Sequence, residues 1–298
     1  MKRKSILSIS LILGWVFLSS CEDIIDVQIE QKQKKIVVDA FIDNAIRTQR
    51  IRLTESIPYF DSSKTEPPVS DAQVVLADTG SFKLFNFTYK ENGYYEWEPN
   101  PASGDTLQVG RNYALLIIQG GDTIVGVSRL NPTIDKIDSI RTVPVKGNGP
   151  PFIDSGKYIE LFAKDRPGMG DFYWIKLFRN DTQNSRLNNL NISQDMGNNS
   201  NGQDGDYFIY PVRFNRNNEF LRPYRQDEKV RIEVYSINRE TFYWFQIIQN
   251  QANNGGLFAT PPVNIQSNMF MLGAHSGRGV AGFYNVGAVV GDEIIIQE

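Results

Sequence analysis

Short runs of alternating or β-branched residues, separated by turn residues, restrict the first part of the chain to a β fold. The clearest pair is residues 111–118 and 123–127, which are joined by Gly120, Gly121 and Asp122. Glycines supply the positive φ angles that a tight turn between two strands needs. The pattern therefore predicts a β-hairpin over residues 111–127.

Five more runs of this kind precede the hairpin. They cover residues 35–42, 50–54, 72–78, 81–89 and 93–97. Six or seven short strands with frequent turn signals are typical of an immunoglobulin-like β-sandwich. We expect this sandwich to span residues 35–130, with Asn131 and Pro132 at its end.

Residues 131–298 also carry mostly strand patterns. Residues 158–163, 171–178 and 230–237 alternate or are rich in β-branched and aromatic residues. Residues 180–206 are rich in Asn, Gly, Ser and Asp, which predicts a long surface loop. The tail over 268–296 indicates two or three short strands. We therefore expect a mostly β protein in which a second, β-rich domain follows the sandwich.

One segment, residues 238–253, has the spacing of a helix. Aromatic and aliphatic residues recur there at helical intervals, beginning at Phe242. Asn238 offers N-cap chemistry, and Glu240 places an acid in the first turn. This is the main helix that the sequence predicts.

The first 20 residues have the layout of a secretory signal peptide. Lys2, Arg3 and Lys4 precede an apolar run over residues 6–18. A helix needs about 20 apolar residues to cross a bilayer, so this run favours a cleaved leader over a permanent membrane span.

The leader ends in Leu18-Ser19-Ser20-Cys21, which resembles a bacterial lipobox, and Cys21 is the only cysteine. We expect Cys21 to carry diacylglycerol and acyl chains such as palmitate, and residues 21–34 to form a lipidated tether. Two or more acyl chains hold a protein firmly at a membrane.

Acidic residues follow the predicted lipid anchor directly, at Glu22, Asp23 and Asp26. They resemble the export signal that sends Bacteroidota lipoproteins to the outer face of the outer membrane. A solvated acidic tether explains them equally well. We expect the outer membrane, with the cell surface favoured and the periplasmic face as the alternative.

Composition excludes several classes of site. Without Lys2, Arg3 and Lys4 the chain keeps 28 basic residues against 34 acidic ones, a net charge of −6, so we expect no nucleic acid as a partner. His275 is the only histidine, which excludes a multi-histidine metal site or a Cys/His zinc site.

Three other patterns suggest chemistry, but each departs from the motif that this chemistry requires. Residues 277–282 spell GxGxxG, but a strand pattern follows instead of the helix that dinucleotide binding needs. His275 next to Ser276 lacks the elbow of a nucleophilic serine. Residues 198–206 offer oxygen ligands in a register that fails the EF-hand pattern.

Recognition of a ligand is therefore assigned to the second half of the chain and its long loop. Within that loop we select Asn201, Asp204 and Asp206 as candidate recognition residues. Tryptophans at 97, 174 and 244 are candidates for stacking on sugars, although packing in a core is the commoner role of such residues.

Several blocks of sequence together resemble a known family. They are CEDIID (21–26), KIVVDAFID (35–43), IPYFD (57–61), PVSDAQV (68–74), VGRNY (109–113), residues 230–243, LFATPPVN (257–264) and GFY (282–284). In order and spacing they resemble the Bacteroidota lipoproteins grouped as domain of unknown function 4249. The family is often encoded beside SusC-like TonB-dependent receptors, which implies an outer-membrane β-barrel as partner. It offers no established catalytic residues.

These observations lead to one expected function and two alternatives. We expect a non-enzymatic lipoprotein, without a cofactor, that assists a TonB-dependent transporter in capturing or admitting a ligand. One alternative is a free-standing adhesion or glycan-binding lipoprotein at the cell surface. The other is a divergent hydrolase that acts on glycans.

Overall fold

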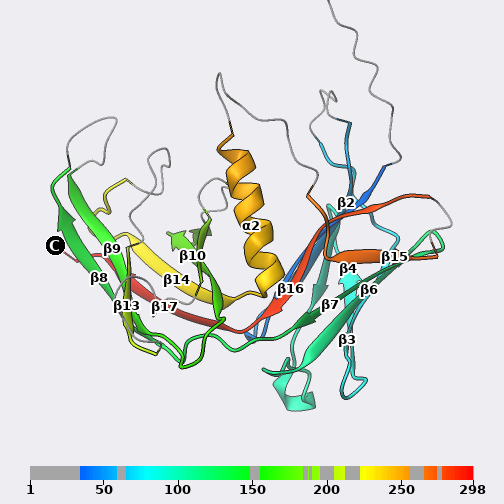
Figure 1. Ribbon diagram of the computed structural model, residues 1–298, viewed down its shortest axis with the longest axis horizontal. Helices are drawn as coiled ribbons and strands as arrows, with labels where there is room; N and C mark the ends of the chain where they lie inside the picture. The colour runs from blue at the N-terminus through cyan, green and yellow to red at the C-terminus, as the bar shows by residue number, and fades with distance from the viewer. Residues whose placement is uncertain are drawn as a thin grey trace, which may run out of the picture. The chain divides into compact units, whose positions relative to one another are not determined.

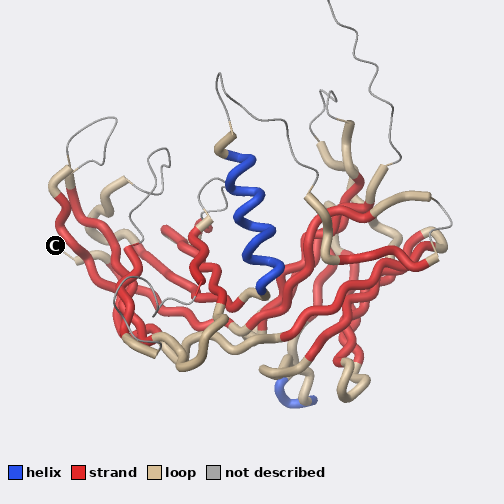
Figure 2. The backbone as a smooth tube through the Cα atoms, viewed as in Figure 1, coloured by secondary structure: helices blue, strands red, loops and turns tan. Residues whose placement is uncertain are grey.

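The computed structural model describes residues 34–58, 65–147, 155–183, 187, 190–194, 205–211, 222–254, 265–273 and 277–297. They form mostly β-strands and one long helix, so the predicted fold class is confirmed (Figures 1 and 2). The predicted signal peptide and tether lie outside these residues, apart from Lys34. None of the described helices has the length and apolar character that crossing a membrane requires.

The first sheet has nine strands. Its strands are β1 (Ile36–Asp43), β2 (Gln49–Glu55), β3 (Gln73–Asp78), β4 (Leu84–Tyr89), β5 (Tyr94–Trp97), β6 (Asn112–Gln119), β7 (Asp122–Arg129), β15 (Met269–Leu272) and β16 (Val280–Gly287). They pair in the order β15-β7-β6-β3-β4-β5-β2-β1-β16, and the short 3-10 helix η1 (Pro101–Ser103) follows β5.

The first sheet bends at β4, so its two halves enclose one core. The first part of β4 pairs with β3, while Thr88 and Tyr89 pair with β5. Alternate residues of each strand point inward, such as Val38 and Ala40 of β1 and Leu115 and Ile117 of β6. This period of two is the pattern that predicts the strands in the sequence.

The C-terminal part of the chain completes this first sheet. β16 pairs with β1 in parallel, from Ile36 opposite Val280 to Asp43 opposite Gly287, and β15 pairs with β7. The strand pairing therefore crosses the boundary that the sequence predicts at residue 130. Local patterns identify strands but carry little information on partners so distant in the chain.

The second half of the chain forms two smaller sheets. A five-stranded sheet contains β10 (Phe172–Arg179), β11 (Thr182–Gln183), β12 (Asn191–Gln194), β14 (Lys229–Ser236) and β17 (Val289–Ile295), and a three-stranded sheet contains β8 (Ile137–Val145), β9 (Gly156–Lys164) and β13 (Tyr207–Pro211). Their facing residues form a second core that includes Leu161, Ile175 and Ile232. β17 follows β16 after Ala288 alone, so one extended segment belongs to both sheets.

The prediction of a loop over residues 180–206 is wrong where β11 and β12 form. Residues 191–194 pair with β10, and Ile192 packs against the apolar cluster under the helix. A single aliphatic residue in a polar run gives no alternation to detect. The edge of β10 supplies the partner that creates this strand.

The predicted helix is confirmed as α2 (Arg239–Ala252), which packs on β10 and β12 through Phe242 and Phe245. Asn238 stands at the N-cap position, but its side chain does not cap the helix, which corrects the sequence interpretation. Its Nδ2 donates to Ser128 Oγ at 2.6 Å, and its Oδ1 accepts from Asn131 Nδ2 at 2.7 Å. Asn238 therefore ties the helix to the first sheet.

Candidate functional site

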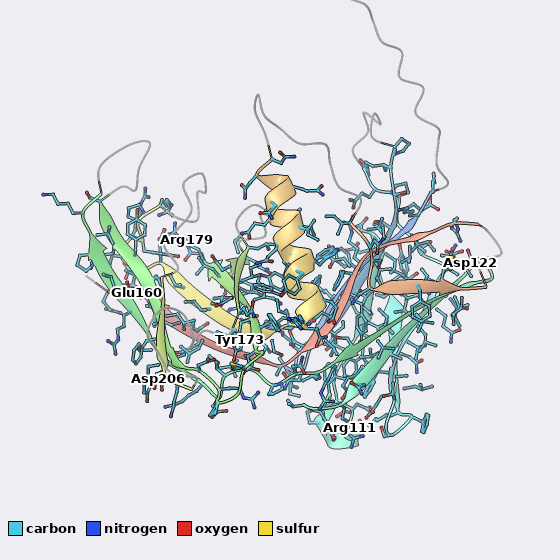
Figure 3. The ribbon with its side chains drawn as sticks, in the orientation of Figure 1. Arg111, Asp122, Glu160, Tyr173, Arg179 and Asp206 are labelled. Atoms are coloured by element: carbon cyan, nitrogen blue, oxygen red, sulfur yellow. The ribbon has the colours of Figure 1, made fainter. Side chains whose placement is uncertain are left out.

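Strands β10 and β14 present one face to the second core and the other to β1 and α2. Tyr173, labelled in Figure 3, is buried in the second core and donates a hydrogen bond to Asp165 at 3.2 Å. Because side chains alternate along a strand, Trp174 and Lys176 lie on the opposite face. There Lys176 is the register partner of Glu233.

Lys176 is a nearly buried lysine, with 9% of its surface exposed. Its ammonium nitrogen lies 4.4 Å from the centroid of the Trp174 ring and 4.2 Å from that of Tyr235. Burial lowers the pKa of Lys176 to about 8, against the opposing attraction of Asp43 and Glu233. The two ring faces support the charged form through cation–π contacts.

A set of ion pairs lies beside Lys176. Arg47 donates to both carboxylate oxygens of Glu233, at 2.7 and 3.2 Å, and also pairs with Asp43. Arg231 shares the Glu233 carboxylate. Both carboxylates are buried, whereas the Arg47 side chain remains 40% exposed. These pairs fasten the turn between β1 and β2 to the second sheet.

Asp39 lies on β1, on the same face as Phe41 and Asp43. Part of the residue is exposed to water, but the surrounding protein buries the carboxyl group and so raises the pKa of Asp39, while the charges of Arg52 and Lys176 oppose this rise. Arg52 is its cross-strand neighbour on β2. A carboxyl group in this position is accessible to a ligand but poorly stabilised as an anion.

Aromatic rings form the wall between this charged region and α2. Phe41 stacks on Phe245, with centroids 5.4 Å apart and planes 11° from parallel, and Trp174 meets Phe41 edge-on at 5.4 Å. Trp244 lies 4.7 Å from Phe283 of β16. Trp174 and Trp244 stay partly exposed. The wall therefore offers ring surface next to charged groups.

We name this region the junction site and define it by the charged residues Asp39, Asp43, Arg47, Lys176 and Glu233 with the rings of Trp174 and Tyr235. The pKa of Asp39 is raised and that of Lys176 is lowered, so the charged form of each group is disfavoured. Such opposed shifts concentrate at functional sites. Paired charges beside ring faces suit the non-covalent binding of a small polar ligand. Among the described residues no group of three metal-ligating side chains is present.

A comparison with models of protein families shows to which family the chain belongs. The model of a family described as domain of unknown function (DUF4249) matches residues 22–289. The chain belongs to the DUF4249 family. The match confirms the resemblance seen in the sequence and includes every residue of the junction site. No curated protein matches this DUF4249 chain.

The candidate recognition residues of this DUF4249 protein lie elsewhere or outside the described residues. Asp206 directly precedes β13 on the three-stranded sheet, where its carbonyl accepts a hydrogen bond from the Asp165 N–H at 3.0 Å (Figure 3). It shares no strand with the junction site. Asn201 and Asp204 lie outside the described residues, as do Cys21 and His275.

The three tryptophans pack in or against apolar cores, which is the commoner role that the sequence analysis gives for such residues. Trp97 is buried in the first core, 4.8 Å from Phe85. Trp174 and Trp244 belong to the cluster under α2. Sequence reasoning missed Lys176, although a lysine inside the otherwise apolar strand FYWIKLFR is the available signal.

The GxGxxG text over residues 277–282 leads into strand β16, as the sequence predicts. The last glycine of this motif, Gly282, has φ +85°, and a Cβ built on it would lie 2.0 Å from the Val38 carbonyl oxygen. Gly282 therefore serves the close approach of β16 to β1, and no phosphate-binding turn is formed.

A second charged cluster has a structural role. The Arg179 guanidinium lies 3.9 Å from the centroid of the buried Tyr224 ring, and Arg222 pairs with Glu228. Glu228 also accepts from the backbone N–H of Arg225 at 3.1 Å. These contacts fasten the turn that precedes β14 to β10, so we assign them to folding.

Proposed function

We propose that this DUF4249 protein is a lipid-anchored outer-membrane protein that captures a ligand for a TonB-dependent transporter. In this proposal it carries out no chemistry itself, and the junction site holds the ligand. The observation that carries the proposal is the junction site, where Asp39 is open to water beside Lys176 and partly exposed rings.

The arrangement of the junction site supports binding. Arg47, Asp43 and Glu233 form a fixed set of ion pairs, so a ligand meets charges that are already oriented. Preorganised charges of this kind cost little ordering entropy when a ligand binds. The leader and Cys21 support the membrane address.

The test of the partner is a pull-down from native outer membranes. Tagged full-length protein is expressed in its own host, extracted in mild detergent with and without cross-linker, and analysed by mass spectrometry. We expect a TonB-dependent β-barrel in stoichiometric amount. A preparation that contains this chain alone, also after cross-linking, would overturn the transporter assignment.

The test of the site uses the ligand that copurifies with this complex. Asp39→Asn removes the exposed charge of the junction site, and the control Asp292→Asn removes an exposed charge on β17. We expect Asp39→Asn to weaken ligand binding by about tenfold or more, which corresponds to roughly 1.4 kcal/mol. Equal affinities of the two variants would exclude the junction site.

A second candidate function is a free-standing adhesion or glycan-binding lipoprotein. The partly exposed rings of Trp174 and Trp244 favour it, because sugars stack on tryptophan faces. A titration of soluble protein with a glycan panel, followed by intrinsic tryptophan fluorescence, tests this alternative. A saturable shift without any barrel partner in the pull-down would favour it.

A further inference from the structure

The outer face of the half-sheet β15-β7-β6-β3-β4 is apolar, although it faces away from the first core. Register pairs align its side chains in three rows: Phe270, Val125, Leu116, Val75 and Asn86; Leu272, Thr123, Ile118 and Gln73; and Val127, Ala114, Ala77 and Leu84. We call these three rows the apolar face. They contain ten apolar residues and no charged one.

The apolar face is open to water. Phe270, Leu272, Val127, Ile118 and Leu84 are each between 41% and 58% exposed. Together these five side chains leave on the order of 500 Å² of apolar surface accessible, as large as the largest patch on a typical monomer. A solvent-facing antiparallel sheet normally alternates with polar residues, so this face is built for contact.

The other half of the same sheet shows what a solvent-facing surface looks like in this protein. On β2 and β5, Arg50 pairs with Glu96 at 2.7 Å, and Arg52 lies over the ring of Tyr94. Two halves of one sheet therefore carry different outer surfaces. We infer from this difference that the apolar face contacts a partner, whereas the outer surface of β2 and β5 faces water.

We propose that the apolar face binds the apolar face of a second copy of this chain and forms a two-fold symmetric dimer by sheet-on-sheet packing. The proposal concerns assembly and is independent of the ligand at the junction site. In such a dimer the same patch meets itself. The central row is flanked on one side by Val127, Ala114, Ala77 and Leu84, and on the other by a row in which Leu272 and Ile118 alternate with the uncharged Thr123 and Gln73. A two-fold axis through the central row therefore opposes mostly apolar and no charged side chains.

Charge favours a second copy over a charged partner. Without the predicted leader each chain has 28 basic and 34 acidic residues, a formal net charge of −6, and two copies repel unless they meet through an uncharged surface. The apolar face provides that surface, because its first charged neighbour on β7 is Arg129 at the end of the strand. An acidic or basic partner would find no group to pair with.

The area of the apolar face also favours a protein partner. A stable interface needs about 800 Å² per partner, and the exposed side chains with the partly exposed residues between them approach this size.

The experiment measures the oligomeric state of residues 22–298, which include the whole compact unit from residue 33 onward. Sedimentation equilibrium from about 1 to about 100 μM should yield the mass of two chains at the upper concentrations. Val127→Glu places two like charges in the contact and should raise the dissociation constant by about 100-fold or more.

The matched control is Ile295→Glu on β17, since Ile295 is 57% exposed and Val127 is 55% exposed. This variant should dimerise as the unmodified chain does, and circular dichroism checks that both variants fold. Residues 22–298 contain no cysteine, so Val127→Cys with a bis-maleimide linker should yield a covalent dimer and Ile295→Cys should not. A monomer throughout the range, or equal behaviour of the two glutamate variants, overturns the proposal.

Discussion

Replacing Lys176 with methionine tests whether the junction site holds its lysine at a cost to stability. The pKa of Lys176 falls from 10.5 to about 8 through burial. Each pKa unit corresponds to about 1.36 kcal/mol, so a charged Lys176 lowers the folding stability at pH 7 by about 3 kcal/mol. Between pH 8 and pH 10.5 the unfolded chain holds this proton and the folded chain does not. Stability should therefore rise with pH in that window.

The assay is urea unfolding followed by tryptophan fluorescence, at intervals from pH 7 to pH 10. In the unmodified protein Lys176 should contribute a rise of about 2–3 kcal/mol over this range, and Lys176→Met should lack it. Burial also raises the pKa of Tyr235 and Tyr284, which lowers stability once unfolded tyrosines ionise, so the series ends at pH 10. The exposed lysine Lys90, replaced by methionine, provides the control.

Lys176→Met also removes a positive charge near Asp43 and Glu233, and this changes the free energy of unfolding by itself. The quantity to compare is therefore the slope of the free energy of unfolding against pH. A variant whose slope equals that of the unmodified protein would refute the reasoning. It would mean that Lys176 reaches water or another partner in solution. The pKa of Lys176 in the junction site would then be that of an ordinary lysine.

Three further outcomes follow from the same structure. Gly282→Ala should lower stability by about 3 kcal/mol or more, because the new Cβ meets the backbone of β1. The control Gly110→Ala should cost about 1 kcal/mol, because Gly110 has a similar φ of +87° but no atom within 4 Å of the new Cβ. Similar urea midpoints would contradict this. Arg47→Met should cost about 2–3 kcal/mol, because it leaves the buried Asp43 carboxylate without its arginine and Glu233 with Arg231 alone. Arg50→Met should cost less than about 1 kcal/mol in the same denaturant series. Asp39→Asn should stabilise the protein at pH 7, since the folded state disfavours the anion, and thermal melts should show this gain disappearing near pH 4; a gain independent of pH would refute it.

The strands and the helix follow from local sequence, which is why they could be predicted closely. The β6–β7 hairpin has its turn at Gly120 and Gly121, with φ of +60° and +87°, as the glycine pattern requires. Strand β1 shows the period of two in its burial. In each case the residues that decide the element lie within it.

The tertiary arrangement could not be predicted in the same way. The pairing of β1 with β16 depends on residues far apart in the chain, and β12 forms because the edge of β10 is available. Asn238 has the residue type of a helix cap, but Ser128 and Asn131 compete for its side chain. Lys176 becomes a site only when β1 supplies Asp43 and β14 supplies Tyr235.

The parallel pair of β1 and β16 also sets a time at which this protein can finish folding. Of the described strands β1 is synthesised first, yet its second neighbour arrives only with residues 280–287. At about 5–20 residues per second, a ribosome leaves that edge of β1 open for roughly 10–50 s. If the chain is exported as we propose, a channel that requires an unfolded chain has this interval in which to act. Under that proposal, the late synthesis of β16 keeps the first sheet incomplete while the chain is translocated.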